Sequence, residues 1–175
     1  NIVFQQEFNF KYYKVLCLVM VLTIYCDPRA GGILDAAQFQ LMAPALADAE
    51  IIQYQTPLAA NPPFIQRLLR YDRPDIILVR DLTPVLVVEQ THEVPSGHNV
   101  GQRFGRLVNA MEEGVMTIFF VPFRGMKHGR YASTCYAPRR LVSAIERMWE
   151  IHDTPILAVL TTVLGKFFPE PFAND

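Results

Sequence analysis

Two runs of strand-forming apolar residues, 76–79 and 85–88, stand on either side of a short polar turn. This pattern predicts a β-hairpin with strands over 75–80 and 85–93. The hairpin constrains the fold more than any other feature of the sequence, because it fixes which residues of the two segments face one another.

Two acids lie at the open end of this hairpin. Residues paired across a hairpin have nearly constant index sums, so Asp75 is expected roughly opposite Gln90. Glu89 and Thr91 point to one face of the strand and Gln90 to the other, which places Asp75 beside Glu89 or diagonal to it. Two carboxylates this close repel one another unless a charge compensates them, and a divalent cation is the usual compensation. The pair therefore predicts a site for Mg²⁺ or Mn²⁺.

An ordinary structural interpretation of the same acids is also open. In it, Asp75 caps a strand after Pro74, and Glu89 forms a partly exposed ion pair with Arg103 or Arg106. The two interpretations differ in whether a metal ion or an arginine compensates the acids.

Strand-like runs alternate with helical patterns along the rest of the chain. The expected elements are a strand over 14–26, a helix from 35 with Asp35 as N-cap, a strand over 50–55, a helix from 62–63, a helix from Asn99 as N-cap to 113 ending at Gly114, a strand over 115–121, a helix over 138–152 and a strand over 155–162. This order predicts an α/β fold, with a central mixed β-sheet flanked by helices. We expect one domain over 1–175, with its core at about 14–162 and with 1–13 and 163–175 as arms or irregular ends.

Composition narrows the function only slightly. The net charge of −1 gives no global basic signal for nucleic acid, so any such surface would be a local patch. Three cysteines without metal spacing predict free thiols in a reducing compartment, hence a cytoplasmic protein. The uncharged segment 15–26 is interpreted as one long buried strand, and a membrane-linked or exported protein is the alternative.

Two polar segments are candidates for contact with nucleic acid. The predicted helix after the hairpin carries a polar side that can face a phosphate backbone: Gln102, Arg103, Arg106 and Asn109. The Gly-rich segment 123–131 is a local basic patch, and its candidate contacts are Arg124, Lys127, His128 and Arg130.

The residues Pro74-Asp75, followed on the next strand by Glu89-x-Thr91, resemble the motif of the PD-(D/E)xK nuclease superfamily, which includes many type II restriction endonucleases. The helix that carries Gln102 is similar to the glutamine-bearing helix of several of its branches. The resemblance covers roughly residues 30–160. It implies a restriction-endonuclease-like core and Mg²⁺-dependent phosphodiester hydrolysis, with Asp75, Glu89 and the Gln90 carbonyl as metal ligands.

The chain departs from the family at one position. The superfamily normally has a lysine where this sequence has Thr91, and a threonine cannot supply that positive charge. Candidates for the missing cation are Arg103, Arg106 and Lys127, with His92 less favoured. An additional acid from an early helix could be Asp35, Asp48 or Glu50.

The sequence thus predicts an Mg²⁺-dependent DNA endonuclease of restriction type, with Asp75, Glu89, Thr91 and Gln102 in its active site. Duplex DNA is the expected substrate, a homodimer the expected state, and no membrane partner is expected. The alternative is a nuclease fold that has lost catalysis and binds nucleic acid or a protein partner.

Overall fold

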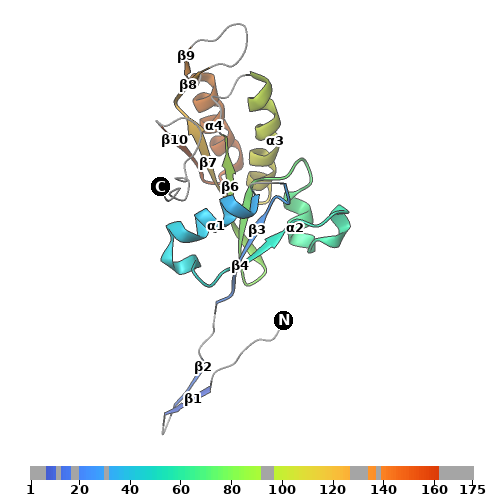
Figure 1. The fold of residues 1–175 in the computed structure, drawn as a ribbon, viewed down its shortest axis with the longest axis vertical. Helices are drawn as coiled ribbons and strands as arrows, with labels where there is room; N and C mark the ends of the chain where they lie inside the picture. Colours follow the sequence, from blue (N-terminus) through green and yellow to red (C-terminus); the bar gives the residue numbers. More distant parts are fainter. Residues whose placement is uncertain are drawn as a thin grey trace, which may run out of the picture.

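A computed structural model gives the fold and describes residues 7–10, 13–16, 20–29, 32–91, 97–126, 134–136 and 139–161 (Figure 1). The strands of its main sheet are β3 (Leu22–Cys26), β4 (Glu50–Gln53), β5 (Ile76–Arg80), β6 (Thr83–Gln90), β7 (Met116–Pro122) and β10 (Ile156–Thr161). The helices are α1 (Gly32–Met42), α2 (Pro63–Leu68), α3 (Gly97–Glu112) and α4 (Arg139–His152), with short 3₁₀ turns at Pro44–Leu46 and Leu58–Ala60. The predicted α/β fold with a mixed sheet flanked by helices is confirmed.

The direction of the strands decides where the site lies. The six strands are ordered β10-β7-β6-β5-β3-β4. Five of these six run the same way, and β5 alone is antiparallel to its neighbours β3 and β6. The carboxyl ends of β3, β4, β6, β7 and β10 therefore meet the amino end of β5 at one edge of the sheet, which we call the site edge.

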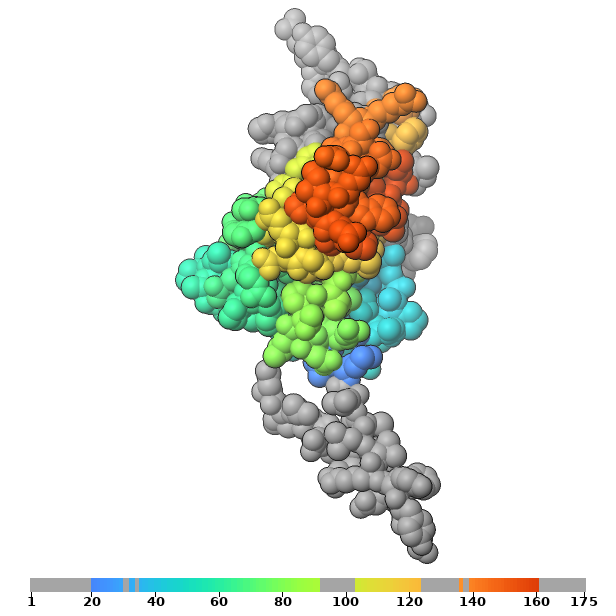
Figure 2. All heavy atoms as spheres, turned by 180° about the vertical axis from the view of Figure 1, so that it is seen from behind, coloured from blue at the N-terminus to red at the C-terminus, as the bar shows by residue number. Residues whose placement is uncertain are grey.

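The two faces of the sheet bury different residues, because strand side chains alternate. Tyr25 and Val87 belong to the face covered by α2, α3 and α4, here called the α3 face. Ile24 and Val88 belong to the opposite face, which packs against α1 and is called the α1 face. In Figure 2, which views the molecule from behind, α4 (orange) and the segment around α2 (blue-green) of the α3 face are both visible.

Two small antiparallel sheets complete the described elements. One pairs β1 (Glu7–Phe10) with β2 (Tyr13–Leu16), and the other pairs β8 (Arg124–Met126) with β9 (Thr134–Tyr136). The prediction of one strand over 14–26 is therefore wrong: β2 pairs with β1, whereas β3 begins at Leu22 within the main sheet. Met20 is 63% exposed, so the apolar run is not continuously buried. Among the described helices, none has the length and apolar character needed to cross a bilayer.

The hairpin is confirmed, with a tighter turn than predicted. Only Asp81 and Leu82 form the turn, and both have positive φ, 48° and 67°. Positive φ at both central residues defines a two-residue turn that matches the right-handed twist of the flanking strands. β6 consequently begins at Thr83. The pairing of β5 with β6 shifts its register between Leu78 and Val79.

Helix ends follow the prediction at some positions and not at others. Gly114 has φ +69°, as expected for the residue after a helix C-terminus. Asp35 and Asn99 are not N-caps, because α1 begins at Gly32 and α3 at Gly97. Trp149 on α4 is 53% exposed, since α3 and β10 cover only the stripe of this helix formed by Leu141, Ile145 and Met148.

Candidate functional site at the site edge

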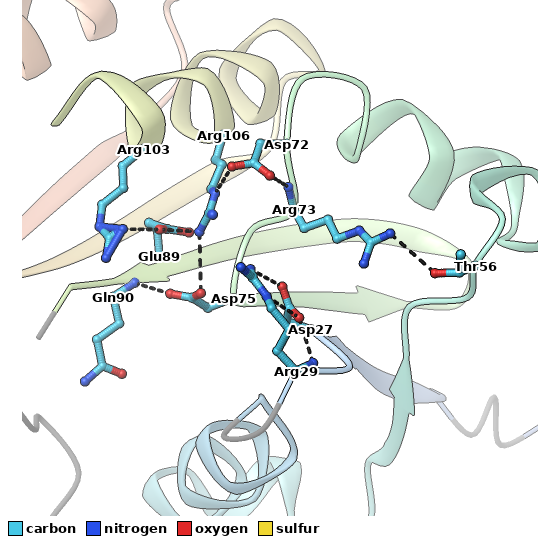
Figure 3. Close-up of polar contacts among 10 residues, drawn as sticks. All are labelled: Asp27, Arg29, Thr56, Asp72, Arg73, Asp75, Glu89, Gln90, Arg103 and Arg106. Carbon is cyan, nitrogen blue, oxygen red and sulfur yellow. Dashed lines mark hydrogen bonds and ion pairs between the residues drawn. The ribbon is translucent and has the colours of Figure 1, made fainter. Parts of the chain in front are cut away.

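The hairpin brings the two predicted acids together. Ile76 pairs with Val88, so the residues just beyond this pair, Asp75 and Glu89, lie next to one another at the site edge. The Gln90 backbone N–H donates a 2.7 Å hydrogen bond to Asp75 Oδ2 (Figure 3). The predicted neighbourhood of the two acids is confirmed.

Pro74 has a specific consequence for the Gln90 backbone. Continuing the register two residues beyond Ile76 and Val88 places Pro74 opposite Gln90. Proline has no N–H, so this position cannot donate a ladder hydrogen bond to the Gln90 carbonyl. That carbonyl points to the same side of β6 as the N–H that reaches Asp75, which makes it a third candidate oxygen ligand beside the two carboxylates.

Arg106 on α3 links both acids. Its Nη1 donates a 2.7 Å hydrogen bond to Glu89 Oε1 and lies 3.6 Å from Asp75 Oδ1 (Figure 3). On the other side of the guanidinium, Nε donates to Asp72 Oδ2 at 2.8 Å. Arg103, one turn earlier on α3, lies 3.7 Å from Glu89 Oε1 through its own Nη1. An arginine thus compensates the acids, as the ordinary interpretation expected, but Glu89 is fully buried and not partly exposed.

The two arginines do not fully offset the cost of burying the negative charges of Asp75 and Glu89. Burial, together with the charge of Asp75, raises the pKa of Glu89 to about 8, although Arg106 and Arg103 oppose the shift. Burial also raises the pKa of Asp75, against the Gln90 N–H and the two arginines. Within the described part of the chain, Glu89 Oε2 and Arg103 Nε are buried without a hydrogen-bond partner. A further cation close to these carboxylates would favour their ionised forms, which burial disfavours.

A pocket of about 300 Å³ opens beside the acids at the site edge. Its lining contains equal numbers of aspartates and arginines, together with a glycine and a glutamine: Asp27, Arg29, Gly32, Asp35, Asp75, Gln90, Arg103 and Arg106. The wall therefore combines residues from the α3 face with residues next to α1. An anionic ligand can meet guanidinium groups there, and a metal ion can meet carboxylates.

The sequence did not reveal the wall formed by Asp27 and Arg29. The Arg29 backbone N–H and its Nε both donate to Asp27 Oδ1 at 2.8 Å, and Nη2 contacts Oδ2. Burial alone would raise the pKa of Asp27, but the hydrogen bonds and charge of Arg29 outweigh it and hold that pKa below its usual value. The Asp27 N–H also donates to the Asp75 carbonyl at 3.3 Å, which ties this wall to the acid pair. An acid directly after a strand was the only sequence signal for it.

Gly32 is required where the same wall turns into α1. Its N–H donates to the Arg29 carbonyl at 2.9 Å. A Cβ at this position would lie 1.9 Å from the Asp27 carbonyl oxygen, closer than any side chain tolerates. The close approach of the two backbones therefore fixes the position of Asp27 in the pocket.

The other predicted residues have mixed outcomes. Asp35 lines the pocket, whereas Asp48 and Glu50 are exposed and are not part of its lining. Thr91 is buried, and its N–H donates to the Phe120 carbonyl at 3.0 Å.

The polar side of α3 is not the open surface that was predicted. Arg106 is only 8% exposed, and Asn109 is fully buried, with its Nδ2 donating to the Arg67 carbonyl at 2.8 Å. Gln102 lies in the second turn of α3. The side chains of Gln102 and Arg124 lie outside the described part of the chain, as do Lys127, His128, Arg130 and His92.

The donor set fits a metal ion only with the help of the backbone. No group of three or more His, Cys, Asp or Glu side chains that could hold a metal converges among the described residues. Asp75, Glu89 and the Gln90 carbonyl are hard oxygen donors of the kind that Mg²⁺ takes, usually with several waters. The unpartnered Glu89 Oε2 is consistent with a ligand position of this type.

Comparisons with protein-family models, with characterised proteins and with solved structures gave no match to this chain. Its function must therefore be inferred from the geometry of the site.

Proposed function

We propose that the protein is a metal-dependent phosphodiesterase that cleaves DNA, with a core of the restriction-endonuclease type. One observation carries this proposal: Asp75 lines a pocket that also contains three arginines, and Glu89, from the neighbouring strand end, is buried beside it and shares the Arg106 guanidinium with it. Close carboxylates beside guanidinium groups are suited to a divalent cation and a phosphate at the same time.

The roles of the residues follow from their positions. Asp75, Glu89 and the Gln90 carbonyl would hold the cation. When bound there, Mg²⁺ would activate a water molecule and offset the negative charge that develops during phosphodiester hydrolysis. Arg29, whose side chain is 66% exposed, is the arginine best placed to meet a phosphate from solvent.

The central sheet supports the proposal in a general way. A mixed sheet flanked by helices agrees with the architecture that the Pro74-Asp75 and Glu89-x-Thr91 resemblance implies. Duplex DNA as substrate, a homodimer that cleaves both strands, and the contributions of Gln102, Arg103 and the 123–131 segment belong to the same proposal.

Nicking of supercoiled plasmid in the presence of Mg²⁺ or Mn²⁺ tests this proposal. We expect the wild-type chain to nick DNA, and Asp75→Ala and Glu89→Ala each to abolish nicking, because each removes a carboxylate ligand. Glu150→Ala is the matched control, since that acid is exposed on α4 and pairs only with Arg147 among the described contacts. Nicking that persists in both site variants, or is absent from the wild type with every metal tried, would contradict the proposal.

A second function is favoured by one specific observation. Arg106 already compensates both acids, and Thr91 stands at the position of the usual lysine, so the fold could bind DNA without cleaving it. In that case calorimetry would detect no Mg²⁺ binding, while DNA binding would persist and weaken steeply with salt as counterions are released.

A further inference from the structure

Arg106 occupies the space that a shared cation would take. Its Nη1 lies 2.7 Å from Glu89 Oε1 and 3.6 Å from Asp75 Oδ1 (Figure 3). The second Asp75 oxygen already accepts the Gln90 N–H. Mg²⁺ binds oxygen at about 2.0–2.1 Å, so an ion that bridges the two facing oxygens cannot share that volume with Nη1. A bridging metal and the inner contacts of Arg106 therefore exclude one another.

The outer side of the guanidinium is anchored independently. Arg106 Nε donates to Asp72 Oδ2 at 2.8 Å, and the Arg73 N–H fixes the other Asp72 oxygen at 2.7 Å. The Asp72 side chain is 40% exposed, whereas that of Glu89 is fully buried. The outer contact can thus persist when Nη1 leaves the acids, and the arginine remains at the wall of the pocket.

We propose that Arg106 is an exchangeable cation of the site. It compensates Asp75 and Glu89 while no metal is bound, gives up both contacts when a metal ion bridges the acids, and stays tethered to Asp72. Released in this way, its charge faces a phosphate in the pocket and replaces the lysine that is absent at Thr91. The inference rests on the proposed function, because it requires Asp75 and Glu89 to be the metal ligands.

Isothermal calorimetry with Mg²⁺ on the full chain tests the exchange, at about pH 8.5 to keep the acids ionised. Arg106→Met should bind Mg²⁺ about ten- to hundredfold more tightly than the wild type, since one charge-assisted hydrogen bond no longer has to break. Arg103→Met is the matched comparison: it removes the same charge from the same helix, but its nearest approach to Glu89 is 3.7 Å and no hydrogen bond has to break, so its affinity should rise clearly less than that of Arg106→Met. Asp72→Asn should bind Mg²⁺ more weakly, because the displaced guanidinium loses its partner.

The outcomes separate this inference from the proposed function. Equal tightening by Arg103→Met and Arg106→Met would show a net-charge effect and overturn the exchange. If the wild type binds Mg²⁺ and Arg106→Met binds it equally tightly or more weakly, the exchange is overturned but the proposed metal site is not. If neither protein binds Mg²⁺, the proposed metal site itself is wrong. If Arg106→Met does not fold, Asp72→Asn decides: weaker binding supports the exchange, and unchanged or tighter binding overturns it.

Discussion

Glu89 should make the folded protein sensitive to pH in the absence of metal. Its side chain is fully buried, and burial with the Asp75 charge raises its pKa to about 8, against about 4.3 in an unfolded chain. A folded pKa above the unfolded value means that the folded state holds its proton more tightly. The corresponding stability is fully present below about pH 4.3 and is lost as the pH rises through about 8. At about 1.4 kcal/mol per pH unit, the loss between about pH 5 and pH 8 is on the order of 4 kcal/mol.

Glu89→Gln keeps the shape of the side chain and removes its ionisation, so this variant should lack that part of the decline. Urea unfolding followed by circular dichroism, with a chelator present, gives the free energy of unfolding of both proteins across this pH range. The difference between them should shift in favour of Glu89→Gln as the pH rises. Glu112→Gln is the control, because that acid is partly exposed on α3, the helix that carries Arg106, and pairs with Arg70. A difference that stays constant from about pH 5 to pH 8, or that moves toward the wild type, would refute the reasoning.

The backbone and core around the site give further predictions. Gly32→Ala should lower the melting temperature and distort the pocket, because its Cβ would lie 1.9 Å from the Asp27 carbonyl oxygen. Gly105→Ala within α3 should be neutral or stabilising by up to about 1 kcal/mol, because its Cβ would lie 3.7 Å from Tyr71 Cβ, an ordinary contact distance. Equal melting temperatures for the two variants would contradict this contrast. Asn109→Ala should cost about 1–3 kcal/mol in urea unfolding, because the Arg67 carbonyl loses its buried donor. A loss below about 0.5 kcal/mol would show that this hydrogen bond is not important.

Hairpin geometry is local, which is why the acid pair could be found from the sequence. The separation of Asp75 and Glu89 depends only on where the chain turns, and apolar runs on both sides located that turn to within two residues. The sequence did not show that Asp81 and Leu82 alone form it, because leucine at positive φ is rare. The resulting error shifted the strand boundary and left the pairing of the acids intact.

Contacts between distant segments were beyond prediction for a physical reason. Asp27 joins the site because β3 pairs with β5, and strand order depends on the packing of the whole sheet. Arg106 was placed on an open face because a helical pattern separates polar from apolar sides. Such a pattern cannot distinguish water from a buried carboxylate such as Glu89, which here faces the polar side of α3. Asn109 was misplaced in the same way, since its polar partner is a backbone carbonyl.

The two ends of β5, the single reversed strand, should differ in how well they tolerate an inserted peptide. This strand carries the segment before Asp75 to the site edge, whereas its other end leads into the turn at Asp81 and Leu82 on the opposite edge. Leu82 is 66% exposed there. A peptide tag inserted at this turn would sit a full strand length from the acids, while the same tag before Asp75 would enter the pocket wall. The topology thus offers a position at which the protein can be labelled or immobilised with its candidate site left open to solvent.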